Sequence, residues 1–381
     1  MTGPASSIVM VVTAYTVLVL WPPLQLPVLG EIVFFASHWV NELPGLVLLL
    51  LVVVAIPPLA AGAPADAFDI VLLGLAAVSV VGLVEVARRG AAERRVVEEA
   101  VIRDLGGGAW PDRIRREATF PRLLRDLVLP LQIRLPRIAR TRNISYGPAG
   151  KRHRLDLYRR RDAATARPVF VHFHGGRFVM GGKSREARAL LFRLADEGWV
   201  SISATYRLRD AGRFPHSLTD AKRVICWVRA HAADYGIDPS LIVVSGSSAG
   251  AHLAAMVALT PNVAQFQPGF EAADASVSAA VCLYGYYGSR ETTDAEASSP
   301  AGWVSETAPP FLIAHGAHDP LIPAAHAEAF TDRLRAKSVQ PVVMVRLRYA
   351  EHSFDLFRSP RFTAVIDGVI AFGTWLRAHR A

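Results

Sequence analysis

The sequence contains few cysteines and no internal repeat. Its two cysteines among 381 residues, Cys226 and Cys282, fall in a predicted helix and a predicted buried strand. We therefore expect packed free thiols, which say little about the redox compartment. Length and the absence of a repeat favour one large domain plus a smaller element over a repeat array.

Two patterns that are similar to cofactor sites are incomplete. Gly182, Lys183 and Ser184 match the end of a Walker A loop, but Arg177 stands where its first glycine is required. The pair His172–His174 has no further ligands in the pattern, which makes it poor evidence for zinc. The sequence therefore predicts neither a phosphate-binding loop nor a metal site.

Charged residues are scarce in three stretches near the N-terminus. Ser7–Leu29 has no charge over 23 residues, Leu43–Ala61 has none over 19, and Phe68–Ala87 contains only Asp69 and Glu85. Each stretch is long enough to cross a hydrocarbon core about 30 Å thick. We predict that residues 1–87 form a transmembrane helical region with two to three spans, three being preferred.

Prolines interrupt this region, and its start lacks basic residues. Pro22, Pro23, Pro57 and Pro58 would kink or end helices, which membrane segments tolerate better than soluble ones. A cleaved signal peptide fits poorly, because there is no basic start and apolar residues recur after residue 30. A buried helical domain of a soluble protein is the alternative.

Arginines follow the third apolar stretch directly, at positions 88, 89, 94 and 95, whereas Asp66 and Asp69 mark the loop before it. Lys and Arg near span ends stay on the cytoplasmic side of a membrane. We therefore predict a multi-pass protein of the cell membrane whose C-terminal domain faces the cytoplasm. Two spans instead of three would leave that side unchanged.

The region after the apolar stretches is strongly basic. Residues 88–161 contain 20 Arg or Lys against 8 Asp or Glu, a formal charge of +12 where the whole chain has +9. Leu123–Ile138 interleaves these charges with apolar residues, as in a helix on an anionic membrane surface. No nucleic-acid-binding module accompanies them, so membrane lipids are the expected partner. We assign residues 88–142 to a basic amphipathic linker, with a cap over the following domain as the alternative.

Gly246–Gly250 has the sequence Gly-Ser-Ser-Ala-Gly between an apolar run, Leu241–Val244, and a helical pattern, Ala251–Leu259. Strand, sharp turn and helix are the context of a nucleophile elbow, whose glycines allow a strained, closely packed turn. Ser248 is therefore the predicted nucleophile. A catalytic cysteine is not expected beside this pattern.

A serine nucleophile at such a strand–turn–helix elbow needs an acid and then a histidine further along the chain, each just after a later strand of the same sheet. Asp319 follows a short buried run, and His352 follows a longer alternating run. We predict that His352 takes the proton of Ser248 while Asp319 orients and stabilises the imidazole. Three neighbours could occupy these places instead: His315, His318 and Asp355.

A negative oxygen in a transition state needs unobstructed backbone N–H groups. His174, Gly175 and Gly176 end an apolar strand at the position where this scaffold carries its His-Gly-Gly loop. Gly175, Gly176 and Ala249 are the predicted donors of the oxyanion hole. Losing one such donor typically costs about 3 kcal/mol of transition-state stabilisation.

Together these motifs resemble the hormone-sensitive-lipase-like branch of the α/β-hydrolases, over roughly residues 143–381. The further matching motifs are Tyr206-Arg207, Phe214-Pro215, Asp220, Trp227, Asp238-Pro239 and Gly246–Leu253. With its apolar N-terminus the chain is most similar to membrane-associated actinobacterial esterases. The resemblance implies ester hydrolysis through an acyl-enzyme, without metal or organic cofactor. Arg177 departs from the small residue usual after His-Gly-Gly, which leaves the shape of the acyl pocket open; Ser247 and Ala251 are milder departures.

Strand-like and helical patterns alternate through residues 143–381, and the strands are apolar on both faces. This predicts the α/β class: an α/β-hydrolase fold with a mostly parallel eight-stranded sheet and helices on both faces. The predicted strands are 143–146, 154–158, 168–174, 199–206, 241–245, 279–284, 311–315 and 341–347, the first two forming an antiparallel hairpin. The predicted helices are 184–197, 217–234, 250–259, 323–337 and 360–378.

The sequence therefore predicts a membrane-anchored serine hydrolase that cleaves carboxylic esters of short or medium acyl chains, with small-molecule or lipid-like substrates. Two alternatives stay open. A peptidase or amidase could use the same triad, because the elbow does not encode the leaving group. A catalytically silent membrane scaffold is the other, since Arg177 lies beside the oxyanion loop.

Overall fold

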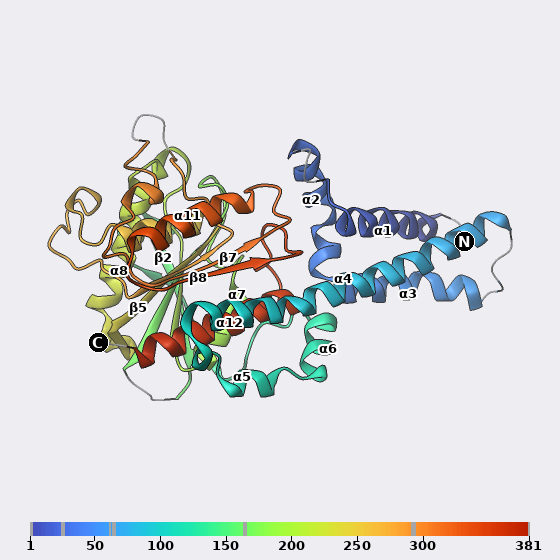
Figure 1. Cartoon of the computed structure of the whole chain (residues 1–381), viewed down its shortest axis with the longest axis horizontal. Coiled ribbons are helices and arrows are strands. Elements are labelled where there is room, and N and C mark those ends of the chain that lie inside the picture. The colour runs from blue at the N-terminus through green and yellow to red at the C-terminus, as the bar shows by residue number, and fades with distance from the viewer. Residues whose placement is uncertain are drawn as a thin grey trace.

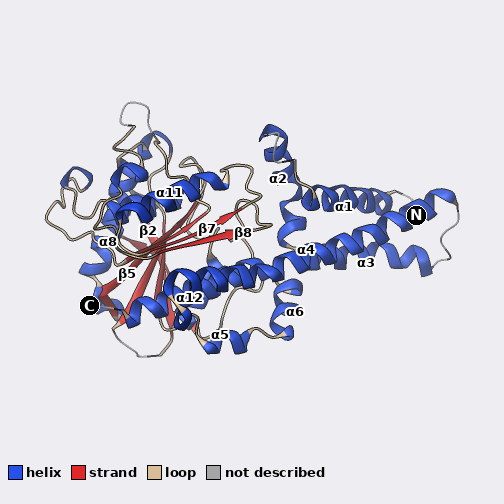
Figure 2. Ribbon diagram, in the orientation of Figure 1, coloured by secondary structure: helices blue, strands red, loops and turns tan. Residues whose placement is uncertain are grey.

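A twisted sheet flanked by helices and a projecting group of N-terminal helices make up the chain (Figure 1). The computed structural model describes residues 3–23, 27–60, 62, 66–162, 166–290 and 295–379. The strands lie together in the centre of the larger part, and helices cover both of their faces (Figure 2).

In the described part of the chain, eight strands form one sheet in the order β1-β2-β4-β3-β5-β6-β7-β8. Their bounds are β1 (Ile138–Ser145), β2 (Arg154–Arg160), β3 (Arg167–Phe173), β4 (Val200–Ala204), β5 (Ile237–Ser247), β6 (Ala279–Leu283), β7 (Phe311–Gly316) and β8 (Val342–Leu347). β2 pairs antiparallel with β1 and β4, and all other pairs are parallel. The predicted eight-stranded, mostly parallel sheet is confirmed.

Two apolar cores cover the two faces of the sheet, because every residue of β3, β4 and β6 is buried. The helices of this domain are α7 (Arg188–Asp196), α8 (His216–Ala230), α9 (Ala232–Tyr235), α10 (Ala249–Leu259), α11 (Ala324–Lys337) and α12 (Pro360–Ala378). α8, α10 and α11 contribute to one core, whereas α7 and α12 contribute to the other. Strands buried on both faces explain why the sequence showed near-continuous apolar runs.

Four helices make up the N-terminal part of the described chain: α1 (Pro4–Leu20), α2 (Pro27–Glu42), α3 (Pro44–Ala60) and α4 (Ala67–Leu105). α1, α3 and the first half of α4 project from the larger domain, whereas α2 lies against it (Figure 1). The second half of α4 joins the core formed by α7 and α12, through Val97, Ala100 and Val101.

α4 is one continuous helix of 39 residues, although the third predicted span ended at Ala87. The basic residues after that point do not end the helix, because they pair along it. Arg88 and Arg89 contact Glu85, and Arg95 contacts Glu99, at spacings of three or four residues that stabilise helices. The helix ends where Gly106 adopts a positive φ of 95°.

Among the described helices, only Ala67–Leu105 has the length and composition to cross a membrane alone. Val28–Glu42 and Pro44–Pro57 qualify only as a pair bent by 83°, and Pro4–Leu20 is shorter. α1 ends at Leu20, just before Pro22 and Pro23, in agreement with the expectation that these prolines would kink or end a helix. Residues 24–26 and 61 of the predicted spans lie outside the described residues.

Small and polar residues join α1 to α4. Thr13 Oγ1 lies 2.8 Å from Ser79 Oγ, and a Cβ on Gly82 would lie 2.4 Å from Thr16 Cγ2. Close backbone approach and hydroxyl hydrogen bonds are the contacts that apolar helices use when their surroundings are also apolar. Near the larger domain, Arg89 donates to the carbonyl of Leu20 at 3.2 Å.

The helix predicted over Leu123–Ile138 is wrong in its second half. Two short helices follow α4: α5 (Asp112–Glu117) and α6 (Phe120–Val128). Pro130 has no backbone N–H to continue α6, and the chain then runs into β1, which begins at Ile138. The sheet therefore starts before residue 143.

Candidate active site

Ser248 lies at the turn between β5 and α10 with φ 55° and ψ −117°, a backbone conformation that residues other than glycine rarely adopt. A Cβ on Gly246 would lie 2.0 Å from the carbonyl oxygen of Gly250, and one on Gly250 would lie 2.0 Å from that of Phe173. The two glycines of the motif are therefore required by backbone contacts. The backbone N–H of Ser248 donates to Leu283 O at 2.9 Å, which ties the turn to β6.

Replacing Gly246 with alanine is expected to distort this turn, because the new methyl group would meet backbone atoms that cannot move independently. Forced overpacking of this kind costs about 1–3 kcal/mol or more. We expect a lower melting temperature in detergent and loss of activity. Gly90→Ala is the matched control, since no atom outside its own stretch of helix lies within 4 Å of its added Cβ. Equal melting temperatures of the two variants would contradict the assignment.

The structure brings the three predicted site residues Ser248, His352 and Asp319 into one chain of contacts. His352 Nε2 lies 3.0 Å from Ser248 Oγ, and His352 Nδ1 lies 2.7 Å from Asp319 Oδ2. The other carboxylate oxygen of Asp319 accepts the backbone N–H groups of Leu321 and Ile322, each at 2.9 Å. The loops after β7 and β8 thus deliver an acid and a histidine to the turn after β5.

The carboxyl of Asp319 is held in its ionised form. Burial raises its pKa, but the charges and hydrogen bonds of His352 and His315 outweigh burial and hold the pKa well below its usual range. His315 Nε2 lies 3.4 Å from Asp319 Oδ2, the oxygen that also contacts His352. An ionised acid at this position fixes the imidazole tautomer that leaves Nε2 free to accept a proton from the serine.

The other neighbouring residues considered for these roles lie elsewhere. His318 packs against the ring of Tyr349, and Asp355 accepts hydrogen bonds from Ser247 Oγ, at 2.5 Å, and from the Tyr284 hydroxyl. Neither contacts Ser248 Oγ in the described structure.

The His-Gly-Gly loop departs from the prediction at its first glycine. The N–H of Gly175 donates to Glu186 Oε2 at 2.5 Å, so this group is not free to meet a substrate oxygen. Within the described residues, the N–H groups of Gly176 and Ala249 have no protein acceptor. Gly176 has a φ of 117°, and a Cβ there would lie 2.2 Å from the carbonyl oxygen of Met180.

The sequence analysis gave no role to Glu186 and named Asp355 only as an alternative member of the triad. Glu186 and Asp355 are both buried, and burial together with the charge of Asp355 raises the pKa of Glu186. Glu186 holds the loop through Gly175, while Asp355 holds Ser247, the residue before the nucleophile. No sequence pattern distinguishes such acids from exposed ones, because their partners lie 11 residues away for Glu186 and 71 and 108 residues away for Asp355.

A cavity of about 270 Å³ opens beside Ser248 and His352. Its other lining residues are Phe34, Phe35, Gly176, Arg177, Val179, Met180, Arg185, Glu186, Leu321, Ile322 and Ser353. Arg177 does not fill this cavity: its side chain is 64% exposed and lies 2.5 Å from Glu31 Oε1. No lining residue comes from 88–142; the helix that covers the site is α2.

α2 is fixed to the larger domain by a buried polar cluster at its C-terminal end. Glu42 pairs with Arg361 and accepts a hydrogen bond from Ser359 Oγ at 2.8 Å. Arg361 also donates to Asn41 Oδ1 at 3.1 Å. Two turns earlier in α2, the ring of Phe34 packs edge-on against the ring of His352, with 6.3 Å between the ring centroids.

The sheet order, the strained serine turn and the serine–histidine–acid contacts define an α/β-hydrolase. The BD-FAE family model matches residues 155–288 and 274–334. Three esterases of Mycobacterium tuberculosis are similar over longer stretches. Probable carboxylic ester hydrolase LipM is 36% identical over 75% of this chain and 74% of its own length. Esterase LipC is 33% identical over 79% of this chain and 80% of its own length. Esterase LipQ is 38% identical over 61% of this chain and 62% of its own length.

Solved structures agree with this assignment. An esterase of Thermogutta terrifontis, Est2, is 26% identical with a TM-score of 0.53, covering 64% of this chain and 93% of its own. A carbohydrate esterase from gut microbiota, at 21% identity and a TM-score of 0.54, shows the same fold. The chain therefore belongs to the hormone-sensitive-lipase-like esterases and is a carboxylesterase-type hydrolase.

Proposed function

We propose that this protein is a membrane-anchored serine esterase that cleaves carboxylic esters of short or medium acyl chains. The observation that carries the proposal is the continuous hydrogen-bonded chain from Ser248 through His352 to Asp319 at the wall of a cavity. Nucleophile, base and orienting acid stand within hydrogen-bonding reach of one another, as acyl transfer requires.

In the proposed reaction, Ser248 Oγ attacks the ester carbonyl while His352 Nε2 takes its proton. The N–H groups of Gly176 and Ala249 stabilise the resulting oxyanion. His352 then gives the proton to the leaving alkoxide, which departs as an alcohol. A water molecule, deprotonated by the same imidazole, cleaves the acyl-enzyme and releases the acid. Gly175 acts indirectly, because its contact with Glu186 fixes the loop.

The cavity favours a small acyl group. Its volume of about 270 Å³ lies just below the range of roughly 300–1,000 Å³ typical of small-molecule sites. Phe34, Val179, Met180, Leu321 and Ile322 give it apolar walls. These features support esters of short or medium acyl chains.

The proposal of multi-pass membrane attachment rests on the projecting helices α1, α3 and the first half of α4. α1 and α3 have 17 residues each, or about 25 Å at 1.5 Å per residue. Their outward side chains, with those of α4, include exposed Val11, Leu49, Val53, Val71 and Val81. Arginines at the domain end of α4 support a cytoplasmic catalytic domain.

A series of p-nitrophenyl esters of increasing acyl length tests the proposed chemistry in detergent-purified protein. We expect hydrolysis with an optimum at short or medium chains, together with covalent labelling by a fluorophosphonate. Matched p-nitroanilides test the alternative of a peptidase or amidase, which faster anilide cleavage would support. Neither hydrolysis nor labelling would favour the silent scaffold.

Asp319→Asn is expected to lower kcat by about 10⁴-fold, because an amide stabilises the wrong imidazole tautomer. Folding should be retained, since the amide is nearly the same size as the carboxyl. Circular dichroism and p-nitrophenyl ester kinetics measure the two effects. Asp210→Asn is the matched control, because the Asp210 side chain is 94% exposed; a loss below tenfold in Asp319→Asn would contradict the assigned role.

A further inference from the structure

α2 presents one face to the active site and an apolar face outward. Phe34, which is 4% exposed, packs against His352, and Phe35 lines the cavity while remaining 62% exposed. The outward face continues with Val28, Ile32 and Trp39, which are 76%, 61% and 56% exposed. These positions follow helical spacing, so they form one stripe along α2.

The opposite rim of the cavity is also apolar and exposed. Val179 and Met180 follow the oxyanion loop, line the cavity, and are 42% and 58% exposed. The contact between Glu31 and Arg177 joins α2 to this loop, but the side chain of Arg177 is 64% exposed and that of Glu31 is 39% exposed. Exposed ion pairs typically contribute only about 0.2–1 kcal/mol, so this contact does not hold the rim closed.

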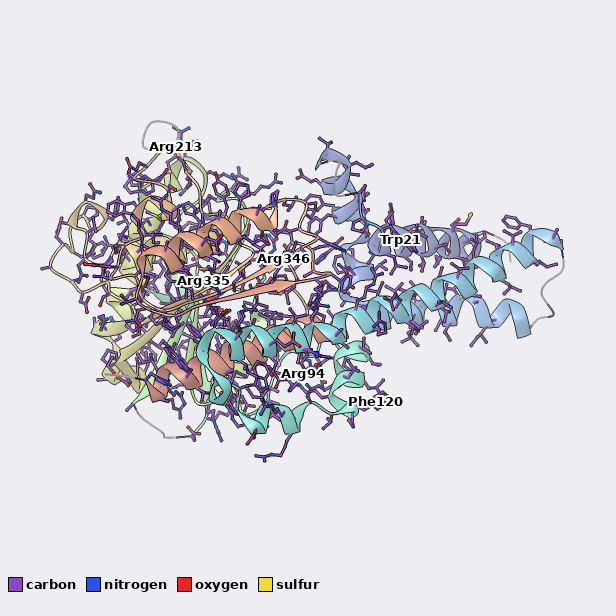
Figure 3. All side chains as sticks on the ribbon, in the orientation of Figure 1. Trp21, Arg94, Phe120, Arg213, Arg335 and Arg346 are labelled. Atoms are coloured by element: carbon purple, nitrogen blue, oxygen red, sulfur yellow. The ribbon has the colours of Figure 1, made fainter. Side chains whose placement is uncertain are left out.

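α2 and α6 mark a common level between the hydrolase domain and the projecting helices. In Figure 1 both lie at the base of the projection, on opposite sides of it. α2 meets α3 at a bend of 83°, so it crosses the direction of the projecting helices. α6 also exposes apolar side chains, and Phe120, labelled in Figure 3, is 72% exposed.

An amphipathic helix that crosses the base of an apolar bundle has the placement of an interfacial helix, with its apolar face in the headgroup and acyl boundary. The apolar stripe of α2 is continuous in the chain with α3, whose sequence over Pro44–Ala60 contains no charged residue. Basic residues surround the same level; Arg88 and Arg95 have side chains 67% and 87% exposed. An anionic lipid surface complements both features.

We propose that α2 is the membrane-facing wall of the active site, and that the substrate is a bilayer-dissolved ester that reaches Ser248 from the lipid, between α2 and the Val179–Met180 rim. This inference rests on the proposed esterase function and membrane attachment. The small cavity takes the reacting end of the substrate, while the remaining apolar part stays in the bilayer. The ester is cleaved to an alcohol and an acid by the acyl-enzyme reaction described above.

The test compares two esters with the same scissile group. 4-Methyl-2-nitrophenyl acetate is water-soluble, and 4-hexadecyl-2-nitrophenyl acetate is anchored in the bilayer by its alkyl chain. The full chain is reconstituted in vesicles of phosphatidylcholine and phosphatidylglycerol. The variant Val28→Asn/Ile32→Asn changes two outward residues of α2 that do not line the cavity.

We expect the variant to hydrolyse the soluble ester within twofold of the wild type and the anchored ester about tenfold more slowly. Val339→Asn is the matched control, because Val339 is 83% exposed on the hydrolase domain away from the cavity; it should leave both rates unchanged. Equal wild-type and variant rates on the anchored ester would overturn the proposal, as would a wild-type preference for the soluble ester.

The same assay separates this inference from the function on which it rests. If all variants hydrolyse the soluble ester at equal rates, the esterase proposal is supported at any rate of hydrolysis of the anchored ester. Failure to hydrolyse either ester, in protein that a fluorophosphonate also fails to label, would overturn the esterase proposal and the inference with it. Vesicles without phosphatidylglycerol measure the contribution of surface charge. We expect their use to lower the rate on the anchored ester and to leave the rate on the soluble ester unchanged.

Discussion

Replacing Ser248 with alanine is expected to lower kcat for p-nitrophenyl esters by about 10⁶-fold, the loss that follows removal of a triad nucleophile. Alanine removes the only atom that can form the acyl-enzyme in the proposed mechanism, while the hydrogen bond of the Ser248 backbone N–H to Leu283 is unchanged. The turn should therefore form as before. Residual turnover would come from the oxyanion donors and substrate binding alone.

Steady-state kinetics and fluorophosphonate labelling measure this loss, with Ser353→Ala as the matched control. Ser353 lines the same cavity, follows His352 directly and has a positive φ of 60°. Its substitution should change kcat by less than tenfold. Full labelling of the Ser248→Ala protein, or equal losses in the two variants, would show that another residue is the nucleophile.

Replacing Glu42 with alanine is expected to destabilise the protein by about 3–5 kcal/mol, because Arg361 would remain buried without its partner. The side chains of Glu42 and Arg361 are 0% and 1% exposed, so water cannot replace the lost contact. Ser359 Oγ would also lose its acceptor. This pair joins the N-terminal helices to α12, so its loss should release α2 from the active site as well.

Thermal melting in detergent measures the effect, and ester hydrolysis reports on the site. The double variant Glu42→Leu/Arg361→Met should recover most of the stability, since a buried ion pair can often be replaced by apolar residues without loss. Exposed Glu306 offers the control, and Glu306→Ala should change stability by less than about 0.5 kcal/mol. A melting temperature of Glu42→Ala equal to that of the control would contradict the structural role of the pair.

The hydrolase domain could be predicted from the sequence because local and long-range requirements agree there. The strands from β3 to β8 lie within a few residues of the predicted ranges, since each is apolar on both faces and bounded by turn residues. The contacts of His352 with Ser248 and with Asp319 follow from the rule that functional residues come after strands of a parallel sheet.

The sequence did not predict how the N-terminal helices meet that domain. Hydropathy identifies apolar stretches, but it does not show that α2 turns back against His352 or that Glu42 is buried beside Arg361. The error at Gly175 has a similar origin. Its motif correctly marks the loop after β3, but the motif does not show that the Glu186 side chain, 11 residues further on, accepts the backbone N–H of Gly175.

α4 is one continuous helix that runs from the projecting helices into the hydrolase core, so it connects the two parts rigidly. In the proposed membrane attachment, this continuous helix sets both the distance of the hydrolase domain from the membrane and its rotation about the helix axis, which a flexible linker would leave variable. Each residue inserted between Ala87 and Val97 would lift the domain by 1.5 Å and rotate it by about 100°. The number of residues in this segment therefore affects the position of the active site, although none of its side chains lines the cavity beside Ser248.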